Sequence, residues 1–224
     1  MEGGSRDGGT IIGPSRVGEN TLVAEGVIIG HPAKDSMLEA RDFTSSRGAQ
    51  VGRGCILRAG TIIYEDAVLG DDVQTAHHVV VREGARVGDG CVLGNNTVVR
   101  EGAELGRNVR VMESVVISEG ALLENDIFIG PGVQFTAGRF MTGAMQAAGK
   151  MSAEEASSEE GRYWNGASVT VEEGARIGAN AVILAGVRLG RGCIVAAGSV
   201  VSNDVPAGGV VMGNPGRLMK RGTP

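Results

Sequence analysis

The sequence repeats a simple pattern every six residues. From Val51 onward a large or β-branched apolar residue recurs at this period, with Thr75 as the one polar exception. The apolar positions are Val51, Leu57, Ile63, Leu69, Val81, Val87, Leu93, Val99, Leu105, Val111, Ile117, Leu123, Ile129 and Phe135, then Val171, Ile177, Ile183, Leu189, Val195 and Val201. An amphipathic helix would instead place apolar residues at i, i+3, i+4 and i+7. The period therefore predicts short strands joined by tight turns.

Two further positions of each hexapeptide support this interpretation. A smaller residue follows four places after each large one, as at Cys55, Thr61 and Ala67. Three places after nearly all of these large residues stand glycine, aspartate or asparagine, from Gly54 to Asp204, and these types tolerate a positive φ. We expect a corner every six residues and a parallel β-helix, in which each coil buries a face that its neighbours complete.

Two excursions interrupt the repeat within what we expect to be a single β-helix domain, residues 1–224. Residues 30–48 shift the phase relative to a shorter apolar run before them, carry mixed charge and are predicted to form a loop. Residues 136–168 form a second insertion with a helix-compatible stretch over 142–158, and residues 213–224 form a short C-terminal tail. Insertions of this length are usually functional or mobile, and the sequence leaves both open.

Composition excludes several classes of function. The 26 acidic and 21 basic residues give a formal charge of −5, which argues against a nucleic-acid partner. No leader pattern and no run of roughly 18 apolar residues is present, so we expect a cytoplasmic protein with no membrane partner. Three cysteines fit a reducing compartment. Cys55, Cys91 and Cys193 all fall at the small inward position and are predicted to be packed thiols, and Cys55 and Cys91, two coils or roughly 10 Å apart, are beyond disulfide reach.

Two adjacent histidines interrupt the pattern after Thr75. His77 falls at the apex of a corner and is expected to point outward, whereas His78 falls on the positive-φ position, which histidine tolerates. If a coil has 18 residues, Asn95 and Glu113 lie on the same edge one and two coils further on. Asn95 is then placed to orient the His77 ring, and Glu113 and His78 to contact a polar substrate. The alternative is that these are solvated corner residues.

The histidine suggests a reaction type. An imidazole is suited to taking a proton from an amine or hydroxyl as that group attacks a carbonyl. No Gly-x-Ser-x-Gly elbow and no exposed cysteine offers a covalent nucleophile. Direct transfer to an acceptor is therefore the simpler mechanism.

The C-terminal segments AGSVVSNDVP and GNPGR resemble the end of the hexapeptide acyl-CoA transferases. The segment VQTAHHVVVREGARVG resembles a subset that includes sugar N-acetyltransferases, with His77 at the position of the family's histidine. This resemblance implies a left-handed parallel β-helix with three hexapeptides per coil, acetyl-CoA or another acyl-CoA as co-substrate, and no metal. It also implies a homotrimer with active sites between subunits and a small-molecule acceptor, such as a nucleotide-linked amino sugar.

The resemblance also carries over five positions as contacts of the acyl-CoA. They are Ala179, Ala197, Ser202, Asn203 and Arg217. Small corner residues allow backbone amides to bond the pantetheine arm, and a guanidinium can pair with phosphate. The segment TAGRFM after Phe135 lacks the acidic and proline contacts of relatives that use nucleotide sugars, which argues against that acceptor.

Three classes of function are therefore in competition. The leading hypothesis is an acyl-CoA-dependent N- or O-acyltransferase with His77 as general base and Asn95 as its helper. The second is a γ-type carbonic anhydrase with zinc on three histidines, which adjacent His77 and His78 and the missing His-x4-His spacing disfavour. The third is a non-catalytic binding or scaffold solenoid, against which the GNPGR ending and the apex histidine argue.

Overall fold

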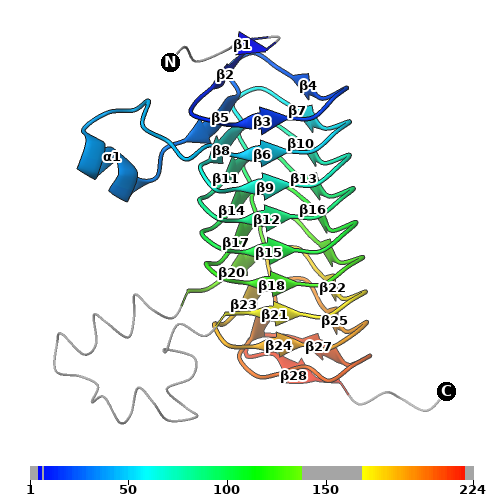
Figure 1. The fold of residues 1–224 in the computed structure, drawn as a ribbon. Helices are drawn as coiled ribbons and strands as arrows, with labels where there is room; N and C mark the ends of the chain where they lie inside the picture. The colour runs from blue at the N-terminus through cyan, green and yellow to red at the C-terminus, as the bar shows by residue number, and fades with distance from the viewer. Residues whose placement is uncertain (1–4, 7, 138–167, 220–224) are drawn as a thin grey trace, which may run out of the picture.

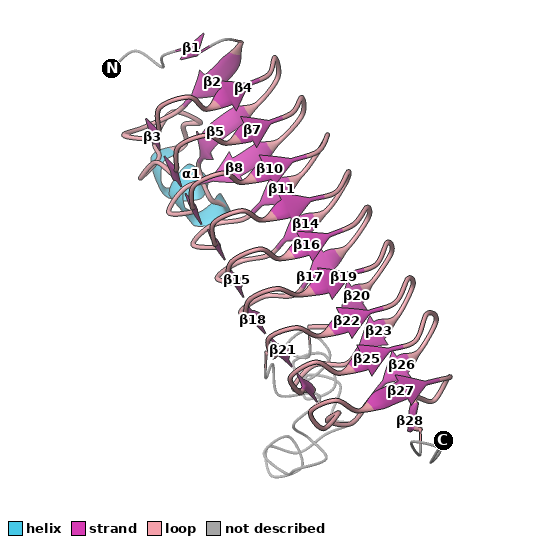
Figure 2. Ribbon diagram, turned by 90° about the vertical axis from the view of Figure 1, so that its right-hand side faces the viewer, coloured by secondary structure: helices cyan, strands magenta, loops and turns pink. Residues whose placement is uncertain are grey.

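A computed structural model describes residues 5–6, 8–137 and 168–219 of the chain. In these residues the chain winds into a left-handed parallel β-helix with three sheets as its sides (Figure 1). Turning the molecule by 90° shows the strands stacked coil upon coil along one axis (Figure 2). The predicted fold is confirmed.

The strands divide among three sheets, here called A, B and C. Sheet A contains β1 (Ser5–Arg6), β2 (Gly9–Ile11), β5 (Ile28–His31), β8 (Ile62–Tyr64), β11 (Val80–Val81), β14 (Val98–Val99), β17 (Val116–Ile117), β20 (Gln134–Phe135), β23 (Val182–Ile183) and β26 (Val200–Val201). Sheet B contains β3 (Arg16–Val17), β6 (Gln50–Val51), β9 (Val68–Leu69), β12 (Arg86–Val87), β15 (Glu104–Leu105), β18 (Leu122–Leu123), β21 (Thr170–Val171) and β24 (Arg188–Leu189). Sheet C contains β4 (Leu22–Val23), β7 (Ile56–Leu57), β10 (Gln74–Thr75), β13 (Val92–Leu93), β16 (Arg110–Val111), β19 (Phe128–Ile129), β22 (Arg176–Ile177), β25 (Ile194–Val195), β27 (Val210–Met212) and β28 (Arg217–Leu218).

The register confirms a coil of 18 residues. Val80 pairs with Val98, which pairs in turn with Val116, all in parallel. Across the first excursion Ile29 pairs with Ile63, so the early apolar run stacks on the same faces as the rest. Its different phase in the sequence is therefore caused by the insertion alone.

The core consists of the two inward positions predicted from the repeat. Large residues such as Leu93 and small ones such as Cys91 are fully buried along the axis. Thr75, the polar exception, is also buried, and its hydroxyl lies 2.9 Å from the hydroxyl of Thr61. Because each buried hydroxyl has a partner, this polar pair is accommodated within an aliphatic core.

The corners follow the predicted turn chemistry with two departures. Positive φ occurs at the expected glycine, aspartate and asparagine positions, and His78 has a φ of 58°. Ser114 also has a positive φ, although serine gave no sequence indication of it. Asp204 was expected to share this conformation and does not. The last corner is shorter, because Val205 pairs with Leu189 and the Asp204 carboxylate accepts the Arg188 N–H at 2.9 Å.

The excursions differ in how far the structure describes them. Residues 30–48 leave sheet A after β5 and contain a short helix, α1 (Lys34–Ala40), where only a loop was expected (Figure 1). Most of the second excursion, including the helix-compatible stretch, lies outside the described residues. In the tail, β28 pairs antiparallel with β27, and residues 220–224 lie outside the described residues. The described part of the chain has no helix of the length and apolarity that crossing a membrane requires.

Glycines at the corner that follows sheet B allow neighbouring coils to approach closely. A Cβ at Gly88 would lie 2.5 Å from the carbonyl oxygen of Gly106, whereas one at Gly84 meets nothing within 4 Å. We therefore expect Gly88→Asn to lower the free energy of unfolding by roughly 1–3 kcal/mol, measured by chemical denaturation, because coil backbones must separate. Gly84→Asn is the matched control, since asparagine tolerates the positive φ there. Equal effects of the two changes would contradict this explanation.

Candidate active site

The corner between sheets C and A carries most of the predicted site residues. His77 lies between β10 and β11, with its side chain exposed, and Asn95 and Glu113 occupy the same place on the next two coils. Ala179 and Ala197 continue this column further along the axis. We call this row of residues the C–A corner.

Asn95 is in contact with His77. The Asn95 side-chain oxygen accepts the backbone N–H of His77 at 2.9 Å and lies 3.3 Å from the ring nitrogen Nδ1. The backbone donor fixes which end of the amide faces the histidine, because only the oxygen can accept it. That same oxygen therefore favours the tautomer with the proton on Nδ1 and leaves Nε2 with a free lone pair.

The backbone contact of Asn95 also has a structural explanation. At the corner between sheets B and C, Asp71 accepts the N–H of Arg53 at 2.8 Å, and Asn125 accepts the N–H of Arg107 at 2.8 Å. A side-chain oxygen one coil further along thus accepts the backbone N–H at other corners as well. What distinguishes the C–A corner is that a histidine ring lies beside the accepting oxygen.

The positions of His78 and Glu113 do not by themselves indicate a role in substrate binding. The positive φ of His78 accounts for its position, and its ring covers Gly60, where an added Cβ would lie 2.2 Å from Nδ1. Glu113 is exposed, and its backbone oxygen accepts the Gly132 N–H at 2.9 Å. Substrate binding by either side chain stays a prediction.

The five predicted acyl-CoA contacts fall into two groups. Ala179 and Ala197 lie on the C–A corner. Ala197 is five coils, or roughly 24 Å, from His77 along the axis. The tail also reaches this corner, because Gly216 donates to the backbone of Val200 at 2.7 Å, and it holds Arg217 at an exposed position on β28. Ser202 and Asn203 follow β26 and therefore lie on the corner between sheets A and B instead.

The thiols are unsuited to nucleophilic chemistry. Cys55, Cys91 and Cys193 are free and fully buried. Burial raises the pKa of the Cys55 thiol and raises the pKa of Cys91 and of Cys193 to about 11. All three are packed as predicted, and a thiol held neutral is a poor nucleophile.

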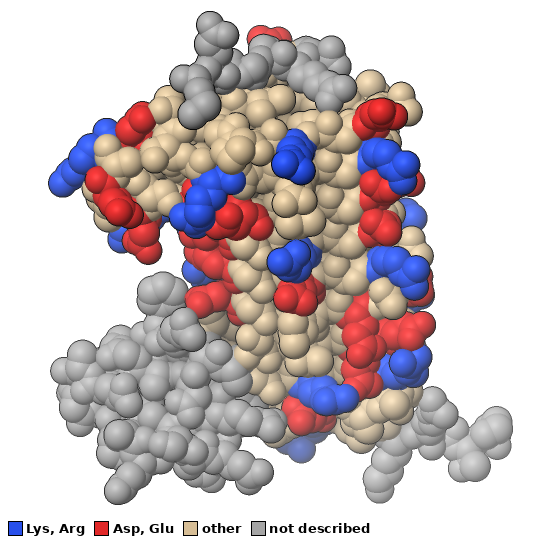
Figure 3. Space-filling view, in the orientation of Figure 1, with Lys and Arg blue, Asp and Glu red and all other residues tan. Residues whose placement is uncertain are grey.

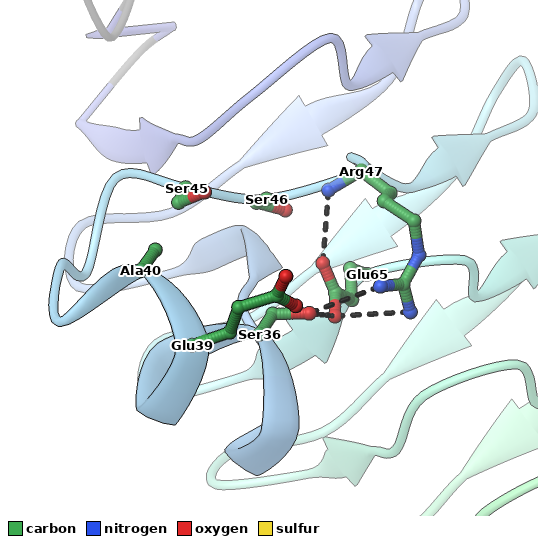
Figure 4. A pocket seen from close by; sticks show the side chains of 7 residues that line it. All are labelled: Ser36, Glu39, Ala40, Ser45, Ser46, Arg47 and Glu65. Atoms are coloured by element: carbon green, nitrogen blue, oxygen red, sulfur yellow. Dashed lines mark hydrogen bonds and ion pairs between the residues drawn. The ribbon is translucent and has the colours of Figure 1, made fainter.

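Beside α1 lies a buried carboxylate, Glu65, that the hexapeptide pattern did not predict. The Glu65 side chain is completely buried. It accepts hydrogen bonds from the Ser36 hydroxyl and the Arg47 N–H and forms an ion pair with Arg47 at 3.1 Å (Figure 4). It also accepts the Ala33 N–H at 3.1 Å. A cavity of about 440 Å³ lies beside this cluster. The available sequence indication was the recurrence of glutamate 18 and 36 residues later, at Glu83 and Glu101.

The three histidines, all within the described residues, do not come together as one cluster. Among the described residues, no group of three or more His, Cys, Asp or Glu side chains is arranged to hold a metal ion. His31 lies away from the other two histidines, and its ring centre is 4.7 Å from that of Tyr64, with the two ring planes tilted by 46°. His77 and His78 have ring centres 6.5 Å apart.

Comparisons with known proteins agree with the fold. Residues 66–101 and 168–203 match the family model described as bacterial transferase hexapeptide (six repeats), and residues 84–119 match the hexapeptide repeat of succinyl-transferase. These stretches of the chain are therefore hexapeptide repeats similar to those of bacterial transferases. No curated protein sequence matches it.

Solved structures extend the comparison to nearly the whole chain. UDP-N-acetylglucosamine acyltransferase from Campylobacter jejuni is similar with a TM-score of 0.53 and 19% identity, covering 92% of this chain and 69% of that one. The corresponding enzyme from Francisella novicida is similar with a TM-score of 0.48 and 18% identity, covering 90% of this chain and 64% of that one. A hexapeptide-repeat acetyltransferase from Vibrio cholerae, solved with acetyl-CoA, is similar with a TM-score of 0.39 and 25% identity, covering 57% of this chain and 69% of that one. The first of these likenesses shows the fold.

Proposed function

We propose that this protein transfers an acyl group, acetyl by default, from acyl-CoA to an amine or hydroxyl of a small molecule. The observation that carries the proposal is the exposed His77 ring beside the Asn95 oxygen, on the same corner as Ala179, Ala197 and the tail that bears Arg217. A histidine held by an amide on an otherwise ordinary corner has no packing role, and it suits proton transfer.

The reaction follows from the tautomer that Asn95 favours. Nε2 of His77 takes the proton from the acceptor as its nitrogen or oxygen attacks the thioester carbonyl. The imidazolium then returns that proton to the sulfur as CoA leaves, so the histidine ends the cycle neutral. Asn95 acts as a positioning residue, because its oxygen holds Nδ1–H throughout.

A homotrimer with sites between subunits is part of this proposal. The outward row of sheet A from β5 to β26 is aliphatic except for Gln134, whereas the outward row of sheet B includes Arg86, Glu104 and Arg188. An uncharged aliphatic face of this length suits contact with another copy. The C–A corner borders that face, so a neighbouring subunit would enclose the exposed His77.

Calorimetric titration with acetyl-CoA and with CoA tests the proposal directly. We expect saturable binding of both and, for Arg217→Ala, an affinity lower by roughly tenfold or more, because a charge-assisted contact with phosphate is lost. Arg110→Ala, an exposed arginine on β16, serves as the control and should leave the affinity unchanged. Absence of saturable binding at high ligand concentration would contradict an acyl-CoA-dependent function.

A further inference from the structure

The outer face of sheet B carries a group of arginines that the proposed function does not use. Arg16 on β3 and Arg86 on β12 point outward from the same row of the sheet, with β6 and β9 between them. Their Cα atoms are therefore about 14 Å apart. Arg47, from the end of the first excursion, stands beside this row at the corner between sheets A and B.

These three arginines line one cavity. It measures about 570 Å³, and its other walls include Gln50, Val68 and Asp66. This volume lies within the range of pockets that hold small-molecule ligands. In the upper half of Figure 3, the basic side chains along the middle of the face are separated only by tan surface, whereas acidic side chains lie next to the basic group on their left.

The charges around the cavity do not balance. Arg47 is neutralised by ion pairs with Asp66 at 2.6 Å and with Glu65. Within the described residues, the side chains of Arg16 and Arg86 form no hydrogen bond or ion pair. Glu104 neighbours Arg86 on β15, on the side away from the cavity, and does not line it.

Several other arginines of this acidic chain are paired. Arg53 forms an ion pair with Asp71 at 2.8 Å, and Arg188 forms one with Glu172. Because Arg16 and Arg86 have no side-chain partner among the described residues, they leave an excess of positive charge along one cavity of a protein whose formal charge is −5. Guanidinium groups bind phosphate oxygens through two parallel hydrogen bonds.

We propose that this cavity binds a phosphate-bearing small molecule, with Arg16 and Arg86 as its principal contacts. A diphosphate is the best match, since it can engage arginines from opposite sides while the rest of the ligand lies over Gln50 and Val68. The site is distinct from the C–A corner and from Arg217, which lies on sheet C at the other end of the solenoid (Figure 1). It stands independently of acyl transfer.

Titration calorimetry at low ionic strength with inorganic pyrophosphate and with uridine diphosphate tests the site. We expect saturable binding, weakened roughly tenfold or more by Arg16→Gln and by Arg86→Gln. Arg110→Gln, an exposed arginine on sheet C, should leave the affinity unchanged. The variants are surface substitutions, and their circular dichroism and melting temperatures should match those of the original protein.

CoA is also a diphosphate, so its titration is run on Arg217→Ala as well. Residual CoA binding that requires Arg16 and Arg86 would support the cavity as a site for CoA phosphates. Binding of uridine diphosphate with the same requirement would support a nucleotide ligand. The proposal is overturned if neither pyrophosphate nor uridine diphosphate binds saturably, or if Arg110→Gln weakens binding as much as Arg86→Gln does.

Discussion

His77→Ala is expected to lower turnover by roughly two to four orders of magnitude, the usual contribution of a general base. The loss should appear in kcat, while acetyl-CoA affinity and oligomeric state remain unchanged, because His77 is exposed and has no part in the core. Steady-state kinetics with an amine or hydroxyl acceptor, together with light scattering, would measure both. A screen of amino sugars and other amines supplies the acceptor.

His78→Asn is the matched control at the same corner. Asparagine tolerates the φ of 58° that His78 adopts, so the fold should persist and turnover should change little. The turnover of Asn95→Ala should lie between those of His77→Ala and His78→Asn, because the His77 ring loses its partner at 3.3 Å while its Nε2 remains. If His78→Asn abolished turnover and His77→Ala did not, the roles assigned at this corner would be reversed.

Glu65→Gln is expected to release the first excursion from the β-helix. The change removes a completely buried carboxylate that joins Arg47 to Ala33 and Ser36, so the local free energy of opening should fall by roughly 1–3 kcal/mol, the cost of leaving buried donors without their acceptor. Hydrogen exchange of residues 31–48 would measure this loss directly. Glu83→Gln, one coil further on, is the matched control, because its side chain is 24% exposed and its loss should cost less than about 1 kcal/mol.

The contribution of Glu65 should also depend on pH. Burial alone raises the pKa of Glu65, but the Ser36 hydroxyl, the amides of Arg47 and Ala33 and the Arg47 guanidinium outweigh burial and hold it below the ordinary value of 4.5. A lowered pKa in the folded state means that the stabilisation is complete above about pH 4.5 and is lost as the pH falls through the folded value. The difference between the original protein and Glu65→Gln should therefore shrink in acid. A difference independent of pH would contradict this account.

Much of the fold could be predicted because its determinants are local. The alternation of Leu93 with smaller residues such as Cys91, and the glycine or asparagine at each corner, specify a strand and a turn within six residues. The same period placed His77 and Asn95 on one edge, since their separation equals one coil. Asp204 departed from the pattern because the final corner is shorter, which depends on how Val205 meets Leu189.

The sequence by itself determined the repeat, the buried thiols and the corner that carries His77, because each depends only on spacing along the chain. Tertiary structure alone decided that Glu65 is buried, since the excursion that covers it supplies Ala33, Ser36 and Arg47 from outside the repeat. It also decided that Arg16 and Arg86 share a cavity. The excursion between them breaks the 18-residue period, so only the folded chain returns Arg16 to the row that Arg86 occupies.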